Sequence, residues 1–539
     1  MTAQSFTDST IGIPSICHEF LLPINQQLDV EAYLRENLGD EFLGAHSSDP
    51  HFMNKNFGVL TVKMPNNPPQ TNPQSLHWVL TVDRSGSMGD LHKGKSKMDN
   101  VKHMLRNLIT YLKTLSTDQD PHFITIIGFD HETTVYCEHY NINDAESPTI
   151  YINYVEPIET RGSTNFGAAF DEASEIITRN YSENERIVHI FMTDGNITSG
   201  SRNIDTITEK CLHPLNLSSS ESRSPPRVFF VGFGIDHNAT FIQKLSDNIT
   251  LSNYYFVENA ENAGYVYGEI ANEVVKEYVH SITITTEYGE IYDYTTNTWE
   301  TSLTLTSLPI EVEKTFHIRM DHPKPEQQAS HRNIRIIFNA NKSNCESNGY
   351  SDIRLISHML SGGINYPNCG VLKFWWRQKA LELLYETRQM LVAEIPYYYE
   401  HTTHSRSQEG ILIEFLESLK RWETLHYNSG CEQFMQDLCD DIYAAIKSLS
   451  TSASIGYMFV NARLNAQGLQ RAYNLCDFSA LERPRYSEPH QIDRMHRPST
   501  ARTTSYSSSS QDYSMQMVTD DYHNLPTVGT EDSEDTVVL

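Results

Sequence analysis

The sequence lacks the run of about 18 apolar residues that a membrane-spanning helix needs. Its most apolar stretches, such as residues 228–235, are short and typical of buried strands. The N-terminus has no basic start followed by an apolar core, so we expect no secretory signal. These absences predict a protein that works in the cytoplasm and does not enter a membrane.

Cysteine is sparse and forms no metal-binding pattern. The eight cysteines are scattered along 539 residues, and no Cys-x-x-Cys pair occurs. A zinc ribbon or a RING-type site would need such pairs. The spacing therefore argues against both, and it favours free thiols in a reducing compartment.

Basic residues are few compared with acidic ones. The chain has 41 Lys plus Arg against 69 Asp plus Glu, which gives a formal net charge of −28. Nucleic acids and anionic membranes are both bound through basic surfaces. We therefore expect neither as a partner.

A hydrophobic content of 39% is enough to bury a sizeable core, and a length of 539 residues suggests about three or four domains.

The middle of the chain, residues 76–277, alternates between two patterns. Continuous apolar strands are predicted at 76–83, 122–130, 188–195, 227–234 and 253–259, with 133–137 as a candidate neighbour of the second. Helical spacing is found at 98–115, 165–180, 238–248 and 261–277. Apolar strands separated by helices indicate an α/β domain with a Rossmann-like, mostly parallel sheet that helices cover on both faces.

The remaining chain divides by its pattern. The predicted regions are an N-terminal region at 1–54 with a candidate helix at 28–43, a strand and connector at 55–75, a β-rich region at 278–368, an α-helical region at 369–480 and a disordered tail at 481–539. The β-rich region shows a period of two, and we expect the early strand at 58–64 to join it in a small β-sandwich. We find no internal repeat.

Oxygen-bearing side chains gather where the predicted strands end. Asp83, Ser85 and Ser87 alternate after the first strand, so they can turn toward one side of the loop. Asp194 follows another strand, and Thr164 lies in a Gly-containing loop before a helix. Open α/β sheets bind ligands at this edge. Oxygen donors suit Mg²⁺, or else Mn²⁺ or Ca²⁺, and do not suit softer metals.

Taken together, these residues resemble the metal-ion-dependent adhesion site of the von Willebrand factor A domain, over roughly residues 76–276. The family pattern is Asp-x-Ser-x-Ser, then a Thr, then an Asp before Gly. The resemblance implies that five residues are metal ligands: Asp83, Ser85, Ser87, Thr164 and Asp194. It also implies an open coordination position on the ion that an acidic side chain of a partner protein fills.

A second likeness concerns residues 231–237, with the sequence Val-Gly-Phe-Gly-Ile-Asp-His. This stretch is similar to the fifth-strand signature of an intracellular branch of the family, in which the domain accompanies a RING finger. Because the chain has no RING cysteine pattern, the resemblance does not imply ubiquitin ligase activity.

Catalytic patterns are missing around these residues. Asp83 lacks the second acid of a phosphatase-type Asp-x-Asp pair, and residues 86–89 do not form a Gly-x-Ser-x-Gly elbow. Residues 232–234 lack the third glycine of a dinucleotide fingerprint. We therefore expect a binding protein and not an enzyme.

The favoured function is metal-dependent protein binding by an intracellular adaptor or scaffold. One alternative is a non-catalytic subunit or substrate receptor of a ubiquitin ligase, and another is a secreted or surface adhesion protein. The acidic segment 531–535 is either a solvating tail or the source of a carboxylate that caps the metal. The sequence does not indicate an oligomeric state.

Overall fold

The computed structural model describes about three fifths of the chain. The described residues are 15–19, 55–63, 75–92, 95–180, 182, 185–212, 226–235, 237–249, 251–257, 260–286, 289–305, 308–309, 313–321, 333–342, 354–359, 369–394, 403–425, 431–449 and 452–470. The candidate helix at 28–43 and the predicted tail at 481–539 lie outside them.

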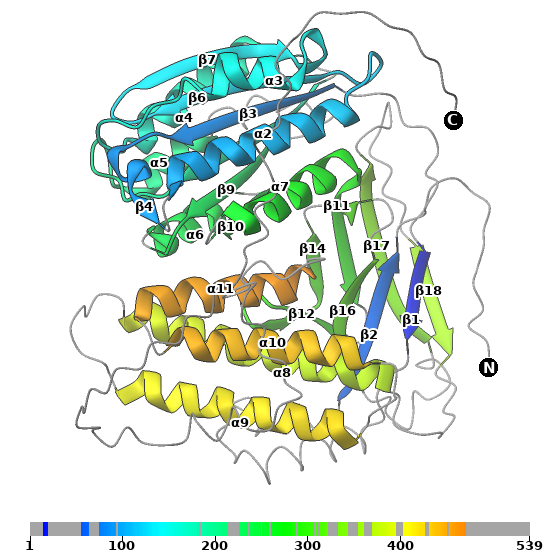
Figure 1. The fold of residues 1–539 in the computed structure, drawn as a ribbon. Helices are drawn as coiled ribbons and strands as arrows, with labels where there is room; N and C mark the ends of the chain where they lie inside the picture. The colour runs from blue at the N-terminus through cyan, green and yellow to red at the C-terminus, as the bar shows by residue number, and fades with distance from the viewer. Residues whose placement is uncertain are drawn as a thin grey trace, which may run out of the picture. The chain divides into compact units, whose positions relative to one another are not determined.

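A six-stranded sheet forms the centre of the α/β domain, with the strand order β10-β9-β8-β3-β6-β7 (Figure 1). In chain order these strands are β3 (Ser75–Asp83), β6 (His122–Phe129), β7 (Thr133–Asn141), β8 (Glu185–Thr193), β9 (Arg227–Phe233) and β10 (Ser252–Val257). All pairings are parallel except that of β7, which runs antiparallel to β6 at the edge. This confirms the predicted mostly parallel sheet.

Helices cover the sheet, and every residue of β8 and β9 is buried. The helices are α2 (Lys97–Leu115), α4 (Phe166–Arg179), α5 (Ile204–Leu212), α6 (Ala239–Asp247) and α7 (Ala260–Val275), with the short α3 (Ser147–Ile150) before a π-helical turn at Tyr151–Val155. In Figure 1, α2 and α7 lie in front of the sheet and α4 lies behind it. Because water reaches neither face of the sheet at these strands, their residues are apolar at successive positions and do not alternate with polar ones.

Capping side chains determine where the helices α2 and α4 begin, beside the carboxyl edge of the sheet. Ser96 and Asp99 form a capping box at α2, in which each side chain accepts a hydrogen bond from the backbone of the other at 3.0 Å. The Asn165 side chain accepts from Ala168 N at 3.3 Å and starts α4. Lys97 and Phe166 therefore open their helices at this edge.

The β-rich region contains two antiparallel sheets. One has the order β1-β2-β16-β12-β13, from Ser15–Glu19, Lys55–Lys63, Glu313–Asp321, Gly289–Asp293 and Thr298–Glu300. The other has the order β14-β11-β17-β18, from Ser302–Leu305, Glu277–Thr286, Asn333–Lys342 and Arg354–Met359, with β15 (Leu308–Pro309) also on β11. The early strand pairs with β16 over its whole length, as expected. The stacking of the two sheets into a sandwich stays a prediction.

Four helices form the C-terminal helical region: α8 (Cys369–Glu394), α9 (Thr403–Leu425), α10 (Glu432–Leu449) and α11 (Ala453–Leu469). The indole rings of Trp376 and Trp422 lie 6.1 Å apart in its buried core. The α11 helix contacts the α/β domain, since Asn461 Nδ2 donates to Gln243 Oε1 at 2.8 Å. Within the described residues, no helix is long and apolar enough to cross a membrane.

Candidate metal centre

The structure brings the five predicted ligands to one edge of the sheet. Asp83 ends β3, and Asp194 directly follows β8. Ser85 precedes and Ser87 lies within a 3₁₀ turn at Gly86–Gly89, while Thr164 lies two residues before α4. Asp83, Ser85, Thr164 and Asp194 are all buried. Parallel strands end at a common edge, which is why residues far apart in sequence meet here.

Short distances connect the five side chains. Ser85 Oγ lies 3.1 Å from Ser87 Oγ, which donates to Asp194 Oδ1 at 2.9 Å. A methyl group added at Gly195 would lie 3.3 Å from both Asp83 Oδ2 and Thr164 Oγ1. These two oxygens therefore flank one small space, which is open because glycine has no side chain. Three hydroxyls and two carboxylates around such a space fit a hard divalent cation.

The Asp83 carboxylate is held in place on both oxygens. Ser85 N donates to Oδ1 at 2.8 Å, and Thr193 Oγ1 donates to Oδ2 at 2.6 Å. Burial, together with the negative charge of Asp194, raises the pKa of Asp83 to about 7, although the hydrogen bonds from Thr193 and Ser85 act in the opposite direction. Two acids held this close repel each other, and a bound cation would relieve that repulsion.

Lys97 is a member of the site that the sequence reasoning missed. Its Nζ lies 2.6 Å from Asp194 Oδ2, and its side chain is only 12% exposed. The capping box of α2 determines this position, because it makes Lys97 the first helical residue. A signal was present in the sequence, since Lys93, Lys95 and Lys97 form a basic cluster soon after Ser87 in an acidic chain. The ammonium group partly neutralises Asp194.

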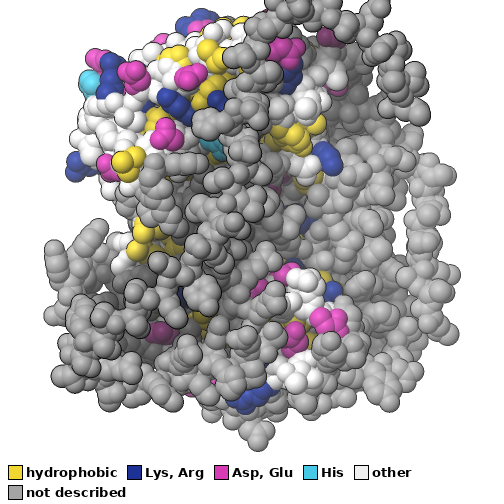
Figure 2. Space-filling view, viewed as in Figure 1, with side chains coloured by type: hydrophobic (Ala, Val, Ile, Leu, Met, Phe, Trp, Pro, Cys, Tyr) yellow, Lys and Arg dark blue, Asp and Glu magenta, His cyan; other side chains and the backbone are white. Residues whose placement is uncertain are grey.

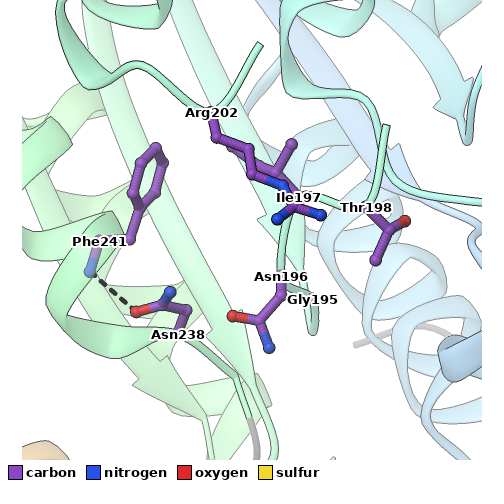
Figure 3. Close-up of a pocket in the computed structure, with 7 residues that line it drawn as sticks. All are labelled: Gly195, Asn196, Ile197, Thr198, Arg202, Asn238 and Phe241. Carbon is purple, nitrogen blue, oxygen red and sulfur yellow. Dashed lines mark hydrogen bonds between the residues drawn. The ribbon is translucent and has the colours of Figure 1, made fainter. Parts of the chain in front are cut away.

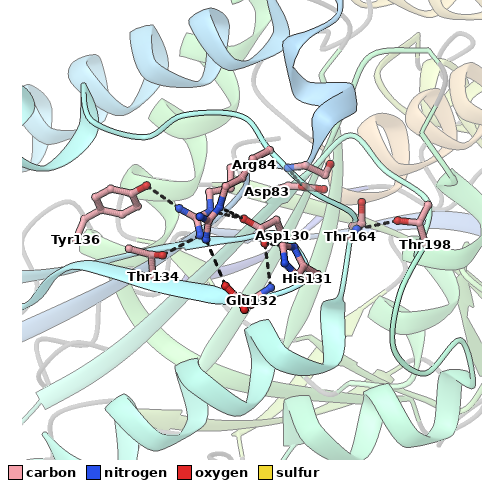
Figure 4. Close-up of polar contacts among 11 residues, drawn as sticks. Asp83, Arg84, Asp130, His131, Glu132, Thr134, Tyr136, Thr164 and Thr198 are labelled. Atoms are coloured by element: carbon pink, nitrogen blue, oxygen red, sulfur yellow. Dashed lines mark hydrogen bonds and ion pairs between the residues drawn. The ribbon is translucent and has the colours of Figure 1, made fainter.

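Arg84 explains why the ligands alternate along the loop. Its side chain turns away from the ligand side, so that Nε lies 2.8 Å from Asp130 Oδ2 (Figure 4). Its Nη1 donates to Tyr136 Oη at 3.1 Å and its Nη2 to Thr134 Oγ1 at 2.8 Å. The guanidinium group thus anchors the loop to the end of β6 and to β7, whereas Ser85 Oγ lies 3.1 Å from Ser87 Oγ, another candidate ligand.

Asp130, at the end of β6, connects the loops that carry the ligands. It accepts from Arg161 Nε at 2.9 Å and from Glu132 N at 3.0 Å. Burial opposes ionisation here, but these two donors hold the pKa of Asp130 below its usual range. Its carbonyl oxygen accepts from Asn165 N at 2.8 Å, one residue after Thr164. Candidate ligands supported in this way would be preorganised for binding.

A pocket opens next to the candidate ligands (Figure 3). It has a volume of about 340 Å³ and is lined by Gly195, Asn196, Ile197, Thr198, Arg202, Asn238 and Phe241. Thr198 connects it to the site, because Thr198 Oγ1 accepts from Thr164 N at 2.8 Å. The side chain of Arg202 is exposed and brings a positive charge to this pocket.

Comparison with protein families identifies the domain. Residues 79–269 match the von Willebrand factor type A domain. The chain contains a von Willebrand factor A domain. The match includes all five candidate ligands. Domains of this family generally mediate protein–protein interactions and often bind a divalent metal ion.

Solved structures with a similar fold include three from microorganisms. A von Willebrand factor type A protein from Catenulispora acidiphila is 13% identical, with a TM-score of 0.47, and the match covers 81% of this chain and 92% of that one. The ArnB paralog VWA2 from Sulfolobus acidocaldarius is 14% identical, with a TM-score of 0.39 and coverage of 76% and 93%. The PilB minor pilin from Streptococcus sanguinis is 15% identical, with a TM-score of 0.31 and coverage of 41% and 75%. No curated protein matches this sequence.

The surface around the domain is mixed in charge. On the face that Figure 2 shows, acidic and basic side chains lie interspersed over the described part of the α/β domain. Among the described residues on this face, the acidic side chains are therefore not gathered into one patch.

Proposed function

We propose that the chain captures a protein partner through a divalent metal ion held by Asp83, Ser85, Ser87, Thr164 and Asp194, and that it is not an enzyme. The observation that supports this most directly is the space beside Gly195, which Asp83 Oδ2 and Thr164 Oγ1 flank. Mg²⁺ is the expected ion, with Mn²⁺ and Ca²⁺ as alternatives, since all donors are oxygens.

The donor set favours binding over catalysis. Three of the five donors are neutral hydroxyls, so the protein supplies only the two carboxylates of Asp83 and Asp194 as charges. A divalent ion held this way would keep positive character and attract an acidic side chain. The residues themselves would orient the ion: Thr193 and the backbone of Ser85 hold Asp83, and Ser87 holds Asp194.

The neighbouring pocket suits the residues that flank such an acid in the partner. Phe241 and Ile197 offer apolar contacts, and the exposed Arg202 offers a positive charge. A partner segment with a second acidic residue near the first would bind best, because Arg202 adds a further attraction.

The proposed setting is the cytoplasm, and the proposed role is that of an adaptor or scaffold. Among the described residues, the thiols of Cys137, Cys211 and Cys439 are free and buried. Free thiols suit a reducing compartment. Residues 231–237 are similar to the intracellular branch of the family. The alternative proposal is therefore that the chain is a non-catalytic subunit or substrate receptor of a ubiquitin ligase whose catalytic part lies on another chain. Co-purification of ligase activity with this protein is the test.

A capture experiment tests the proposal directly. The immobilised full-length protein would be incubated with cytosolic extract in Mg²⁺ and then in chelator, and the Asp83→Ala and Thr164→Ala variants would be compared with wild type. Matched controls are Asp118→Ala and Thr178→Ala, which change exposed residues outside the ligand set. We expect capture of a defined partner by wild type and controls only. Capture that survives chelator, or that Asp83→Ala retains, would contradict the proposal.

A further inference from the structure

A second cluster of metal-binding side chains lies at the opposite edge of the same sheet. His77 is the third residue of β3, Glu185 is the first residue of β8, and His139 lies near the end of β7. His77 and Asp83 are six residues apart on β3, which corresponds to roughly 20 Å. The cluster is therefore separate from the oxygen ligands at the carboxyl edge.

The three side chains converge on one another. His139 Nε2 lies 3.0 Å from Glu185 Oε1 and 3.3 Å from Oε2. His77 Nδ1 lies 3.8 Å from Glu185 Oε2, which is too long for a hydrogen bond. One donor atom from each residue can be chosen so that all three lie within 4.8 Å of one another.

An irregularity in the edge strand directs His139 into the cluster. Ile124 pairs with Tyr140 and Ile126 with Cys137, so two residues of β7 stand opposite Thr125. This is a β-bulge, and bulges often re-aim a side chain. His139 also has a positive φ of 44°, which is uncommon for a residue other than glycine.

Neighbouring groups orient the two imidazoles, the buried His77 more firmly than the partly exposed His139. The Thr125 hydroxyl oxygen accepts from His139 N at 2.9 Å and lies 2.8 Å from His77 Nε2. The His139 ring stacks on Phe123 with centroids 4.2 Å apart. A neutral imidazole with one nitrogen held by a hydroxyl presents the other as a ligand.

We propose that His77, His139 and Glu185 form a second metal site, which takes a zinc ion. Two imidazoles and a carboxylate suit Zn²⁺, with metal–ligand distances of about 2.0–2.2 Å. Two ligands of one tetrahedral ion lie roughly 3.3–3.6 Å apart, and the three atoms here lie within 4.8 Å of one another, so a movement of roughly 1 Å is needed. His139 can make it, because its side chain is 27% exposed. A fourth position is left for water, and the ion would tie the edge strand β7 to β3 and β8.

Zinc titration of the full-length protein tests this site separately from the oxygen site. The metal-free protein would be placed in excess Mg²⁺, which prefers oxygen ligands, and then titrated with Zn²⁺ against a chromophoric chelator. Glu185→Gln keeps the shape of the side chain. His139→Asn keeps a residue that tolerates a positive φ. His103→Asn is the matched control, because His103 is exposed on α2.

We expect one zinc equivalent that Glu185→Gln and His139→Asn each weaken by roughly 100-fold or more. His103→Asn and Asp83→Ala should keep it. Zinc should also raise the melting temperature of wild type more than that of the two site variants. Equal zinc affinity in wild type and both variants would overturn the site and leave a His139–Glu185 hydrogen bond in its place. Loss of the same equivalent in Asp83→Ala would also overturn it. Neither result would contradict metal-dependent capture at the other edge.

Discussion

Lys97 should compete with the metal ion for the candidate site, and replacing it should tighten Mg²⁺ binding. The Lys97 ammonium lies 2.6 Å from Asp194 Oδ2, so an ion bound beside Asp194 must share the carboxylate with it or displace it. In Lys97→Met the side chain keeps a similar length and loses its charge. The repulsion between the two cations is then removed.

The expected magnitude follows from the charges. A unit charge and a divalent ion 4 Å apart in surroundings with an effective dielectric constant near 20 interact by about 8 kcal/mol, twice the value for two unit charges. Lys97 can swing toward solvent, which reduces this to roughly 1.4–2.8 kcal/mol, and each 1.4 kcal/mol corresponds to a tenfold change. We expect Mg²⁺ to bind roughly 10- to 100-fold more tightly. In chelator, the variant should be less stable than wild type, because the buried Asp194 loses a counter-charge.

Calorimetric Mg²⁺ titration and thermal unfolding, with and without chelator, would measure both effects. Lys102→Met is the matched control: it removes the same charge from the same helix, where Lys102 Nζ donates to the carbonyl oxygen of Glu156 at 2.7 Å. The control should leave Mg²⁺ affinity unchanged. Unchanged or weaker Mg²⁺ binding in Lys97→Met would refute the reasoning, since Lys97 would then not oppose the ion.

Three further perturbations follow from the same contacts. Gly195→Ala places a methyl group 3.3 Å from two ligand oxygens and should weaken Mg²⁺ binding by roughly tenfold with little loss of stability; unchanged binding would contradict this. Arg202→Glu should weaken capture of an acidic partner, most at low salt, without changing Mg²⁺ affinity in titrations. Burial lowers the pKa of His189 to about 4. As the pH drops from 6.5 toward 4, the His189 imidazole is therefore protonated in the unfolded chain but not in the folded one, and the stability of the fold decreases. Denaturant titrations should show that the free energy of unfolding falls less in His189→Asn than in wild type between pH 7 and pH 5, by about 2 kcal/mol.

The gathering of the five candidate ligands could be predicted from the sequence because each of them stands at a recognisable local position. Asp83 and Asp194 directly follow apolar strands, and parallel strands bring such residues to one edge. Lys97 could not be placed in the same way. Its contact with Asp194 depends on where α2 starts, and that start depends on the capping box of Ser96 and Asp99.

The cluster at the amino edge was beyond sequence reasoning for a different reason. His77, His139 and Glu185 come from three strands and carry no spacing motif. A bulge and a positive φ at His139 bring them together, and neither leaves a mark in the residue pattern. The sequence pattern also does not mark α11 as a separate helix within the predicted α-helical region at 369–480. Ten of its residues are buried, so it lacks the apolar stripe that marks an amphipathic helix.

Local charge at the oxygen site changes sign with the ion, although the chain as a whole is strongly acidic. With both acids ionised, Asp83, Asp194 and Lys97 together carry one negative charge, and a divalent ion turns this into one positive charge. An acidic partner would thus be repelled by the empty site and attracted by the loaded one. The net charge of −28 acts in the opposite direction at long range, and salt screens it. As ionic strength rises toward physiological values, the long-range repulsion of an acidic partner should therefore decrease more than the attraction to the bound metal ion. Capture through exposed charges alone would instead only weaken.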